Sequence, residues 1–136
     1  MTRRQFTVRE AAALLGVSDD TVRRWGDAGR LALSPGSAGR LTVDGAQLAE
    51  LAQEVAAESA LAEAFPASKA SARNRVTGIV TRVVRDGVMA QVDLQAGPFR
   101  IVTLMSREAA DELELEPGSL AVASIKATNV VLEVPA

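Results

Sequence analysis

The sequence contains no cysteine and no histidine. Their absence excludes cysteine nucleophiles, histidine general bases, zinc fingers and most transition-metal sites. It also excludes disulfides, in keeping with a reducing compartment. No activated nucleophile or acid–base pair can be assembled from the remaining residues. We therefore expect a cytoplasmic protein that is not an enzyme.

Aromatic residues make up only 3% of the 136 residues, against 48% apolar and 24% charged residues. The cores must therefore be built from small aliphatic side chains. No run approaches about 20 apolar residues, so we expect no membrane span, and the N-terminus lacks the apolar stretch of a signal peptide. Two small aliphatic cores would each be marginally stable, which favours burial at a subunit interface and a homo-oligomer.

The pattern of apolar residues changes from helical to β-type near the middle of the chain. A proline followed by small polar residues marks this change and predicts a linker over residues 66–70. We expect a helical domain over 1–65 and a β domain over 71–136. The net charge is −2, but residues 1–45 carry seven arginines against five carboxylates. Basic charge is therefore concentrated at the front of the chain.

A capping box opens the first expected helix. Thr7 is followed three residues later by Glu10, the spacing at which each side chain reaches the other's backbone N–H. Apolar residues follow at helical spacing until Gly16, a typical left-handed helix end. Ser18 then caps a second helix. Two short helices joined by a tight turn with glycine form the helix-turn-helix pattern.

The second expected helix ends near Gly29 and carries Val22 and Trp25 on its inward face. Arg23 and Arg24 lie beside that face, so one or both can point outward. In helix-turn-helix proteins the second helix enters the major groove, where arginine contacts guanine edges or phosphates.

Two short strands, over 30–33 and 40–43, are expected after this helix, joined by a flexible loop over 34–39. Together they predict a wing that places Arg40 at the DNA backbone. A further helical stripe follows from residue 45 to about 65, in one or two helices. Its expected capping pair is Asp44 and Gln47. Its apolar positions are Leu48, Leu51, Val55 and Leu61.

The segment FTVREAAALLGVSDDTVRRWGDAGRL resembles the DNA-binding head of MerR-type and excisionase-type winged helix-turn-helix proteins. This resemblance implies double-stranded DNA as a partner. The residues that it and the wing assign to DNA are Ser18, Thr21, Arg23, Arg24 and Arg40. Two alternatives stay open, since the arginines could be merely solvated, or the head could bind protein.

Period-two alternation in the second half predicts five short strands and one helix, which fit a small five-stranded OB-like β-barrel. The strands are expected over 76–84, 88–94, 99–104, 120–126 and 130–134, with a helix capped by Ser106 and running through Leu113. The fold class expected for the whole chain is therefore α+β.

This half resembles the molbindin domain (Mop, TOBE-type) of molybdate-binding proteins. The resemblance implies molybdate or tungstate as the ligand, bound between subunits of a dimer or hexamer. The residues that the resemblance assigns to oxyanion binding are Ser71, Ala72, Arg73, Thr103, Ser106, Lys126, Ala127 and Thr128. Molybdate is a tetrahedral dianion without protons at neutral pH, so its site should offer only donors. Taken singly, each hydroxyl could equally be an exposed strand residue.

These features together predict a one-component transcription regulator whose DNA binding responds to molybdate or tungstate. One alternative is a storage or buffering protein whose head serves assembly or partner binding. A second is a plain DNA-binding protein whose β domain has lost its ligand.

Overall fold

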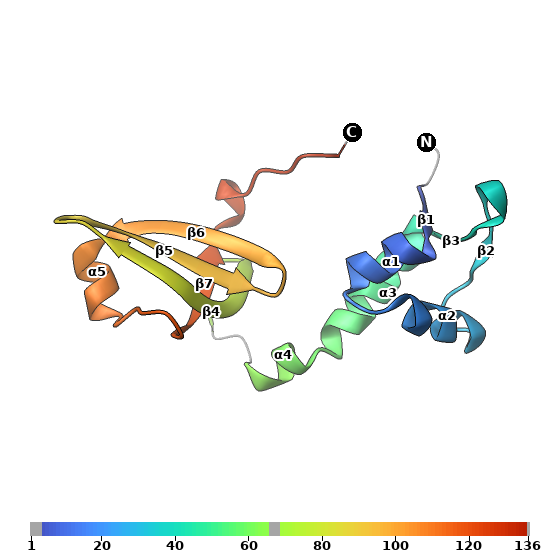
Figure 1. The fold of residues 1–136 in the computed structure, drawn as a ribbon, viewed down its shortest axis with the longest axis horizontal. Coiled ribbons are helices and arrows are strands. Elements are labelled where there is room, and N and C mark those ends of the chain that lie inside the picture. The colour runs from blue at the N-terminus through green and yellow to red at the C-terminus, as the bar shows by residue number, and fades with distance from the viewer. Residues whose placement is uncertain (1–3, 66–68, 136) are drawn as a thin grey trace. The chain divides into compact units, whose positions relative to one another are not determined.

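The computed structural model describes residues 4–65 and 69–135, and its contacts divide the chain into two units, Met1–Pro66 and Ala67–Ala136. Helices dominate the first unit and an antiparallel sheet the second (Figure 1), which confirms the α+β class. Part of the expected linker, residues 66–68, lies outside the described residues. Within the described ranges, no helix combines the length and apolar character needed to cross a membrane.

Helix α1 (Val8–Leu15) begins and ends as the sequence predicts. Thr7 Oγ1 accepts a hydrogen bond from the Glu10 N–H at 3.2 Å, and Glu10 Oε1 accepts one from the Thr7 N–H at 3.0 Å. The hydrogen bond from the Thr7 N–H is the largest cause that lowers the pKa of the Glu10 carboxyl. Gly16 closes the helix at φ 70°, in the left-handed region.

Helix α2 (Asp19–Asp27) is capped by Ser18, whose Oγ accepts from the Thr21 N–H at 3.1 Å. Val22 is fully buried and Trp25 packs against the same core, so the predicted inward face is confirmed. The core of this unit also includes residues from α1, from the segment after α2, and from the strand and helix that follow this segment. Its buried members are Val8, Ala11, Ala12, Val22, Leu31, Val43, Leu48 and Leu51.

A three-stranded antiparallel sheet of order β1-β3-β2 forms the wing. The strands are β1 (Gln5–Thr7), β2 (Ser34–Pro35) and β3 (Leu41–Asp44), with a 3-10 turn η1 (Ser37–Gly39) between the last two. The strand expected over 30–33 is wrong. Leu31 lies in the core, and the N–H of Ala32 donates to Gln47 Oε1 at 3.0 Å instead of to a strand.

Two helices, α3 (Gly45–Ala57) and α4 (Ala60–Ala64), follow the wing. Asp44 occupies the N-cap position of α3 without a side-chain capping bond, and its expected partner Gln47 is used by Ala32. Leu61, expected on the apolar stripe of α3, is 50% exposed because α3 ends before it.

The second unit is a curled four-stranded antiparallel sheet of order β6-β5-β4-β7 with one short helix. Its elements are β4 (Asn74–Arg85), β5 (Met89–Ala96), β6 (Phe99–Ser106), α5 (Arg107–Glu112) and β7 (Leu120–Ile125). The β4–β5 register shifts between Val80 and Arg82, and such a bulge bends its strand. Val80, Val92, Leu94 and Leu115 form the core.

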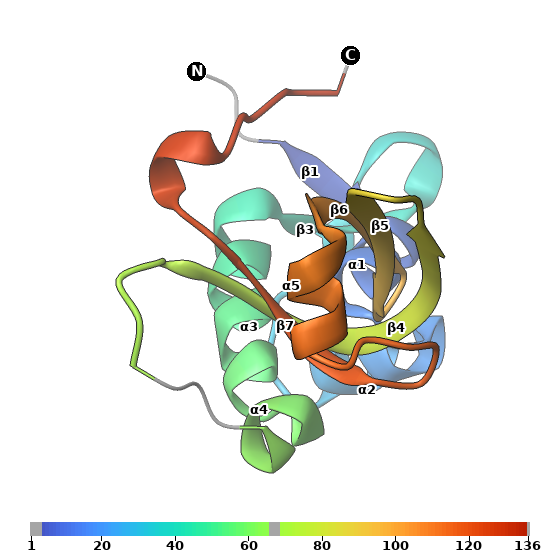
Figure 2. The ribbon, with the colours of Figure 1, turned by 90° about the vertical axis from the view of Figure 1, so that its left-hand side faces the viewer.

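The expected fifth strand over 130–134 does not form in the described part of the chain. After β7 the chain makes a 3-10 turn, η2 (Ala127–Asn129), and then runs on outside the sheet (Figure 2). Val131, Leu132 and Val134 are about nine-tenths exposed. Four of the five residues over 130–134 are apolar, but no strand of the same unit pairs with this segment among the described residues.

Candidate functional site

One end of the β4–β7 ladder brings together two of the segments expected to bind an oxyanion. Asn74 pairs with Ile125 in the antiparallel register, and Asn74 Nδ2 donates to the Ile125 carbonyl oxygen at 3.2 Å. Residues 71–73 directly precede this pair and residues 126–128 directly follow it. The two segments therefore leave the sheet from the same end.

The polar side chains of these segments are open to solvent. Ser71, Arg73, Lys126 and Thr128 are all exposed, while Ala72 is half-buried. Neither Arg73 nor Lys126 forms an ion pair with any described residue. Neither segment contains a carboxylate. This end of the sheet thus offers two uncompensated cations, hydroxyls and backbone N–H groups, which suits a multiply charged anion without protons.

Thr103 and Ser106 lie elsewhere in the unit. Thr103 pairs with Val92 and is half-buried on the core side of β6, whereas Ser106 ends that strand. Thr103 pairs with Val92 on β5, and Val92 pairs with Val83 on β4. Val83 is about 10 residues from Arg73, a distance of roughly 30 Å along an extended strand. Figure 1 likewise shows α5 at the opposite end of the sheet from η2. One chain therefore does not bring all the expected residues together.

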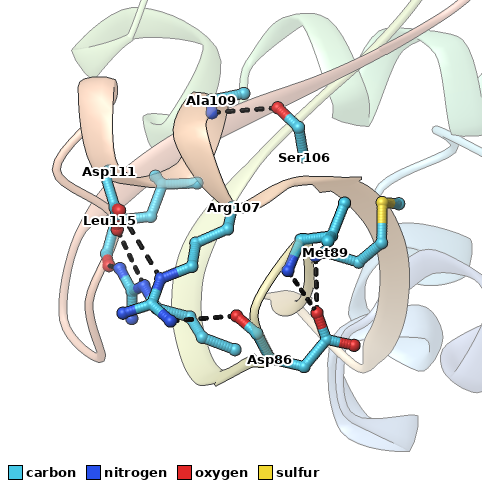
Figure 3. Close-up of polar contacts among 9 residues, drawn as sticks. Asp86, Met89, Ser106, Arg107, Ala109, Asp111 and Leu115 are labelled. Carbon is cyan, nitrogen blue, oxygen red and sulfur yellow. Dashed lines mark hydrogen bonds and ion pairs between the residues drawn. The ribbon is translucent and has the colours of Figure 1, made fainter.

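Ser106 caps α5, and polar contacts of other residues hold this helix against the β4–β5 hairpin (Figure 3). Ser106 Oγ accepts from the Ala109 N–H at 3.0 Å, and Arg107 Nη1 donates to the Asp86 carbonyl oxygen at 2.9 Å. Arg85 Nε donates to Asp111 Oδ1 at 2.9 Å. The N–H groups of Met89 and Val88 donate to the Asp86 carboxylate and lower its pKa. Part of the bonding capacity of Ser106 is therefore already used for helix capping.

A buried carboxylate lies on the face of the sheet away from the core. Asp93 is only 5% exposed, and Arg100 donates to its Oδ2 from Nε at 3.0 Å and from Nη2 at 2.8 Å. The Arg100 and Gln91 hydrogen bonds lower the pKa of this carboxyl. Asp93 is thus a paired structural charge. No cluster of three metal-ligating side chains occurs in residues 4–65 and 69–135.

In the first unit, the residues predicted to contact DNA separate into two groups. Ser18, Thr21 and Arg24 are three apart, so they share one face of α2. Ser18 Oγ and Thr21 Oγ1 lie 3.0 Å apart, and Arg24 Nη2 donates to Thr21 Oγ1 at 3.2 Å. We name these three residues the polar face of α2.

Arg23 and Arg40 meet elsewhere, in a surface cleft of about 420 Å³. The cleft is lined by Thr7, Val8, Arg9, Asp19, Arg23, Arg40 and Leu41. Sequence reasoning did not select Arg9, although the register of β1 against β3 explains its position. Thr7 pairs with Thr42, and α1 begins directly after Thr7, so the first turn of this helix, which holds Arg9, lies beside Arg40 and Leu41 in the cleft.

Other arginines of this unit have structural partners. Arg30 Nη2 lies 2.9 Å from Glu58 Oε1 and its guanidinium stacks on Trp25 at 4.9 Å. Arg4 lies 3.5 Å from Glu10 and stacks on Phe6 at 4.8 Å. By contrast, Arg9, Arg24 and Arg40 form no ion pair with any residue that the structure describes. The guanidinium groups of these three residues are available to a ligand.

Comparison with known proteins agrees with this division of the chain. A family described as a helix-turn-helix domain matches residues 6–55, and the TOBE domain family matches residues 70–132. The molybdenum transport protein ModE of Herbaspirillum seropedicae is 42% identical over 65 residues, which are 47% of this chain and 24% of that protein. The chain thus spans about a quarter of the length of this curated relative.

Solved structures similar to about half of the chain include a molybdate-binding protein from Sporomusa ovata, at 27% identity and a TM-score of 0.48, and MopII from Clostridium pasteurianum, at 30% identity and 0.46. The chain covers 100% of each, with 49% and 48% of its own length. ModG, a cytoplasmic molybdate-binding protein, is 42% identical, with a TM-score of 0.48 and coverage of 50% of this chain and 49% of that chain. The chain is a helix-turn-helix domain followed by a TOBE domain.

Proposed function

We propose that this protein is a transcription regulator whose DNA binding responds to molybdate or tungstate. The observation that carries the proposal is the meeting of residues 71–73 and 126–128 at one end of the β4–β7 ladder. These segments belong to a TOBE domain, and the chain also carries a helix-turn-helix domain. ModE is named for molybdenum transport and ModG binds molybdate in the cytoplasm, so we assign the ligand and the compartment by analogy.

The donor set supports a dianion as the ligand. Arg73 and Lys126 together offset a charge of −2, and Ser71 and Thr128 add hydroxyl donors. Hydrogen phosphate carries a proton that would find no carboxylate acceptor in these two segments, so selection against it follows from the same donor set. In this proposal the chain binds and releases its ligand without converting it.

A second copy of the chain completes the site. Thr103 and Ser106 are separated from Arg73 by about 30 Å along the strand direction. In an assembly they would therefore contribute to the oxyanion site of a neighbouring copy. The exposed apolar segment 130–134 and the open edges of β6 and β7 support such an assembly, because unpaired edges and exposed apolar residues favour strand addition. We propose a dimer or a hexamer.

Coupling between the two functions follows from linkage. If the oxyanion changes how copies associate, it changes the spacing of the helix-turn-helix heads on DNA. The oxyanion and DNA then alter each other's affinity by the same factor.

The experiment measures fluorescence anisotropy of a duplex from upstream of the protein's own operon, at fixed salt, with and without molybdate. We expect specific binding whose affinity changes on adding molybdate, and calorimetric heat on titrating molybdate alone. Arg73→Ala should weaken molybdate binding by more than about tenfold, since a charge-assisted hydrogen bond contributes about 1.5–3 kcal/mol. Lys69→Ala removes a nearby charge and is the matched control. Molybdate binding without any specific DNA binding would instead support storage or buffering.

A further inference from the structure

We infer that the cleft between α1, α2 and β3 binds a phosphate of the DNA backbone, with Arg9, Arg23 and Arg40 as its ligands. This inference rests on the proposed DNA-binding function and assigns separate tasks to two surfaces of the head. The polar face of α2 would contact base edges, whereas the cleft would fix the position of the head on the duplex.

Three parts of the fold build the cleft. The β1–β3 pairing of Thr7 with Thr42 brings the start of α1 beside Arg40. Asp19 and Arg23 are four residues apart and so share one face of α2. The cleft of about 420 Å³ lies between this face of α2 and the place where the start of α1 lies beside Arg40. Three guanidinium groups that are distant in the sequence therefore line one concavity.

The charge balance of the cleft favours an anion. Arg9 and Arg40 have no ion-pair partner among the described residues, and the only partner recorded there for Arg23 is the exposed Asp20, at 3.6 Å. Asp19 is the single carboxylate in the lining, which leaves a net charge of +2. The guanidinium fork matches phosphate oxygens in geometry.

The first helix of a helix-turn-helix motif crosses the DNA backbone while the second lies in the major groove. A cleft between the starts of both helices and the wing therefore faces phosphates rather than base edges. Arg24 differs from Arg23 in this respect, because its guanidinium is turned toward Thr21 on the polar face of α2 and it does not line the cleft.

The test uses the full-length protein and two labelled duplexes of equal length and composition, one from upstream of its own operon and one scrambled. Anisotropy is measured over a range of NaCl concentrations for wild type, Arg9→Gln and Arg24→Gln. Arg9→Gln should weaken binding to both duplexes by about tenfold and reduce the slope of log affinity against log salt by about 1. Arg24→Gln should instead reduce the preference for the operon duplex.

Two further variants sharpen the test. Arg4→Gln removes an equal charge from the same unit outside the cleft, so its salt slope should equal that of the wild type. Asp19→Asn removes the one negative charge of the lining and should tighten binding to both duplexes. The emission of Trp25, the only tryptophan, checks that the first unit of each variant is folded, because Trp25 packs against its core.

If Arg9→Gln bound both duplexes with the same affinity and salt slope as Arg4→Gln, the assignment of the cleft would be wrong, but the proposed function would stand. Failure of the wild type to bind either duplex would overturn both. Inorganic phosphate, added at constant ionic strength, should not displace the scrambled duplex. Binding of inorganic phosphate that disappears in Arg9→Gln, while the affinity of this variant for both duplexes stays that of the wild type, would show a site for free phosphate and overturn the assignment to DNA.

Discussion

Asn74 and Ile125 are 51 residues apart in the sequence, yet the side-chain amide of one donates to the backbone carbonyl oxygen of the other at 3.2 Å. This bond holds together the first pair of the β4–β7 ladder. The donor-bearing segments 71–73 and 126–128 both begin at that pair. Their mutual geometry therefore depends on Asn74, whose side-chain amide donates to the sheet.

Asn74→Ala should weaken molybdate binding severalfold and destabilise the TOBE domain by about 1 kcal/mol, the typical contribution of a neutral hydrogen bond. Calorimetric titration and thermal unfolding measure the two effects. Gln95→Ala is the matched control, because Gln95 Nε2 donates to the Gly97 carbonyl oxygen at 2.8 Å at the β5–β6 turn. An equal loss of molybdate affinity in both variants would contradict a positioning role for Asn74.

Leu132→Asp should dissociate the assembly, because it places a charge in an apolar segment that we expect a second copy to cover. Burial of one leucine contributes about 1.5–3 kcal/mol, and light scattering should then report the mass of a single chain. Leu14→Asp, in α1, changes another exposed leucine, 66% exposed against 89%, and should leave the mass unchanged. A wild-type protein with the mass of one chain would rule out the shared site.

Asp93 should make the TOBE domain sensitive to acid. Its pKa is lowered in the folded state by the Arg100 and Gln91 hydrogen bonds, below the value of about 3.9 expected in the unfolded chain. The stability that this charge contributes is therefore fully present above pH ~4 and is lost as pH falls through the folded pKa. Asp93→Asn should lower the melting temperature at pH 7, and the difference from wild type should narrow toward pH 3. A constant difference would mean that packing, not charge, is lost.

Gly78→Ala should destabilise the TOBE domain by about 1–3 kcal/mol, the usual cost of overpacking. A Cβ at this position would lie 2.5 Å from the Gln95 carbonyl oxygen, a backbone atom that cannot turn aside. Gly87→Ala adds the same methyl group where no atom lies within 4 Å, so its denaturation midpoint should shift far less. Equal midpoints for the two variants would show that β4 and β5 can separate at little cost.

Features determined by neighbours in the sequence could be predicted well. The Thr7–Glu10 capping box and the Ser18 cap each depend on residues three apart, and the structure confirms both. Features determined by distant partners could not. Arg9 looks like any exposed helical position until the β1–β3 pairing brings the start of α1 beside Arg40 in one cleft. Asp93 alternates as an outward residue of β5, and only its bonds to Arg100 reveal a buried charge.

The segment 130–134 shows a different limit of sequence reasoning. Its run of apolar, mostly β-branched residues predicts a strand, yet the described part of the same chain supplies no partner for it. A pattern of hydrophobicity indicates that a strand is to be paired, but it does not say whether the partner belongs to the same molecule.

The distance between Arg73 and Thr103 within one chain has a consequence for the cell. If two chains complete the proposed oxyanion site, it would form in proportion to how much of the protein is assembled, so its occupancy would depend on protein abundance as well as on the oxyanion. Cells that make more of the regulator would respond at a lower molybdate concentration. The expression level of the gene would therefore set the threshold of its own sensor.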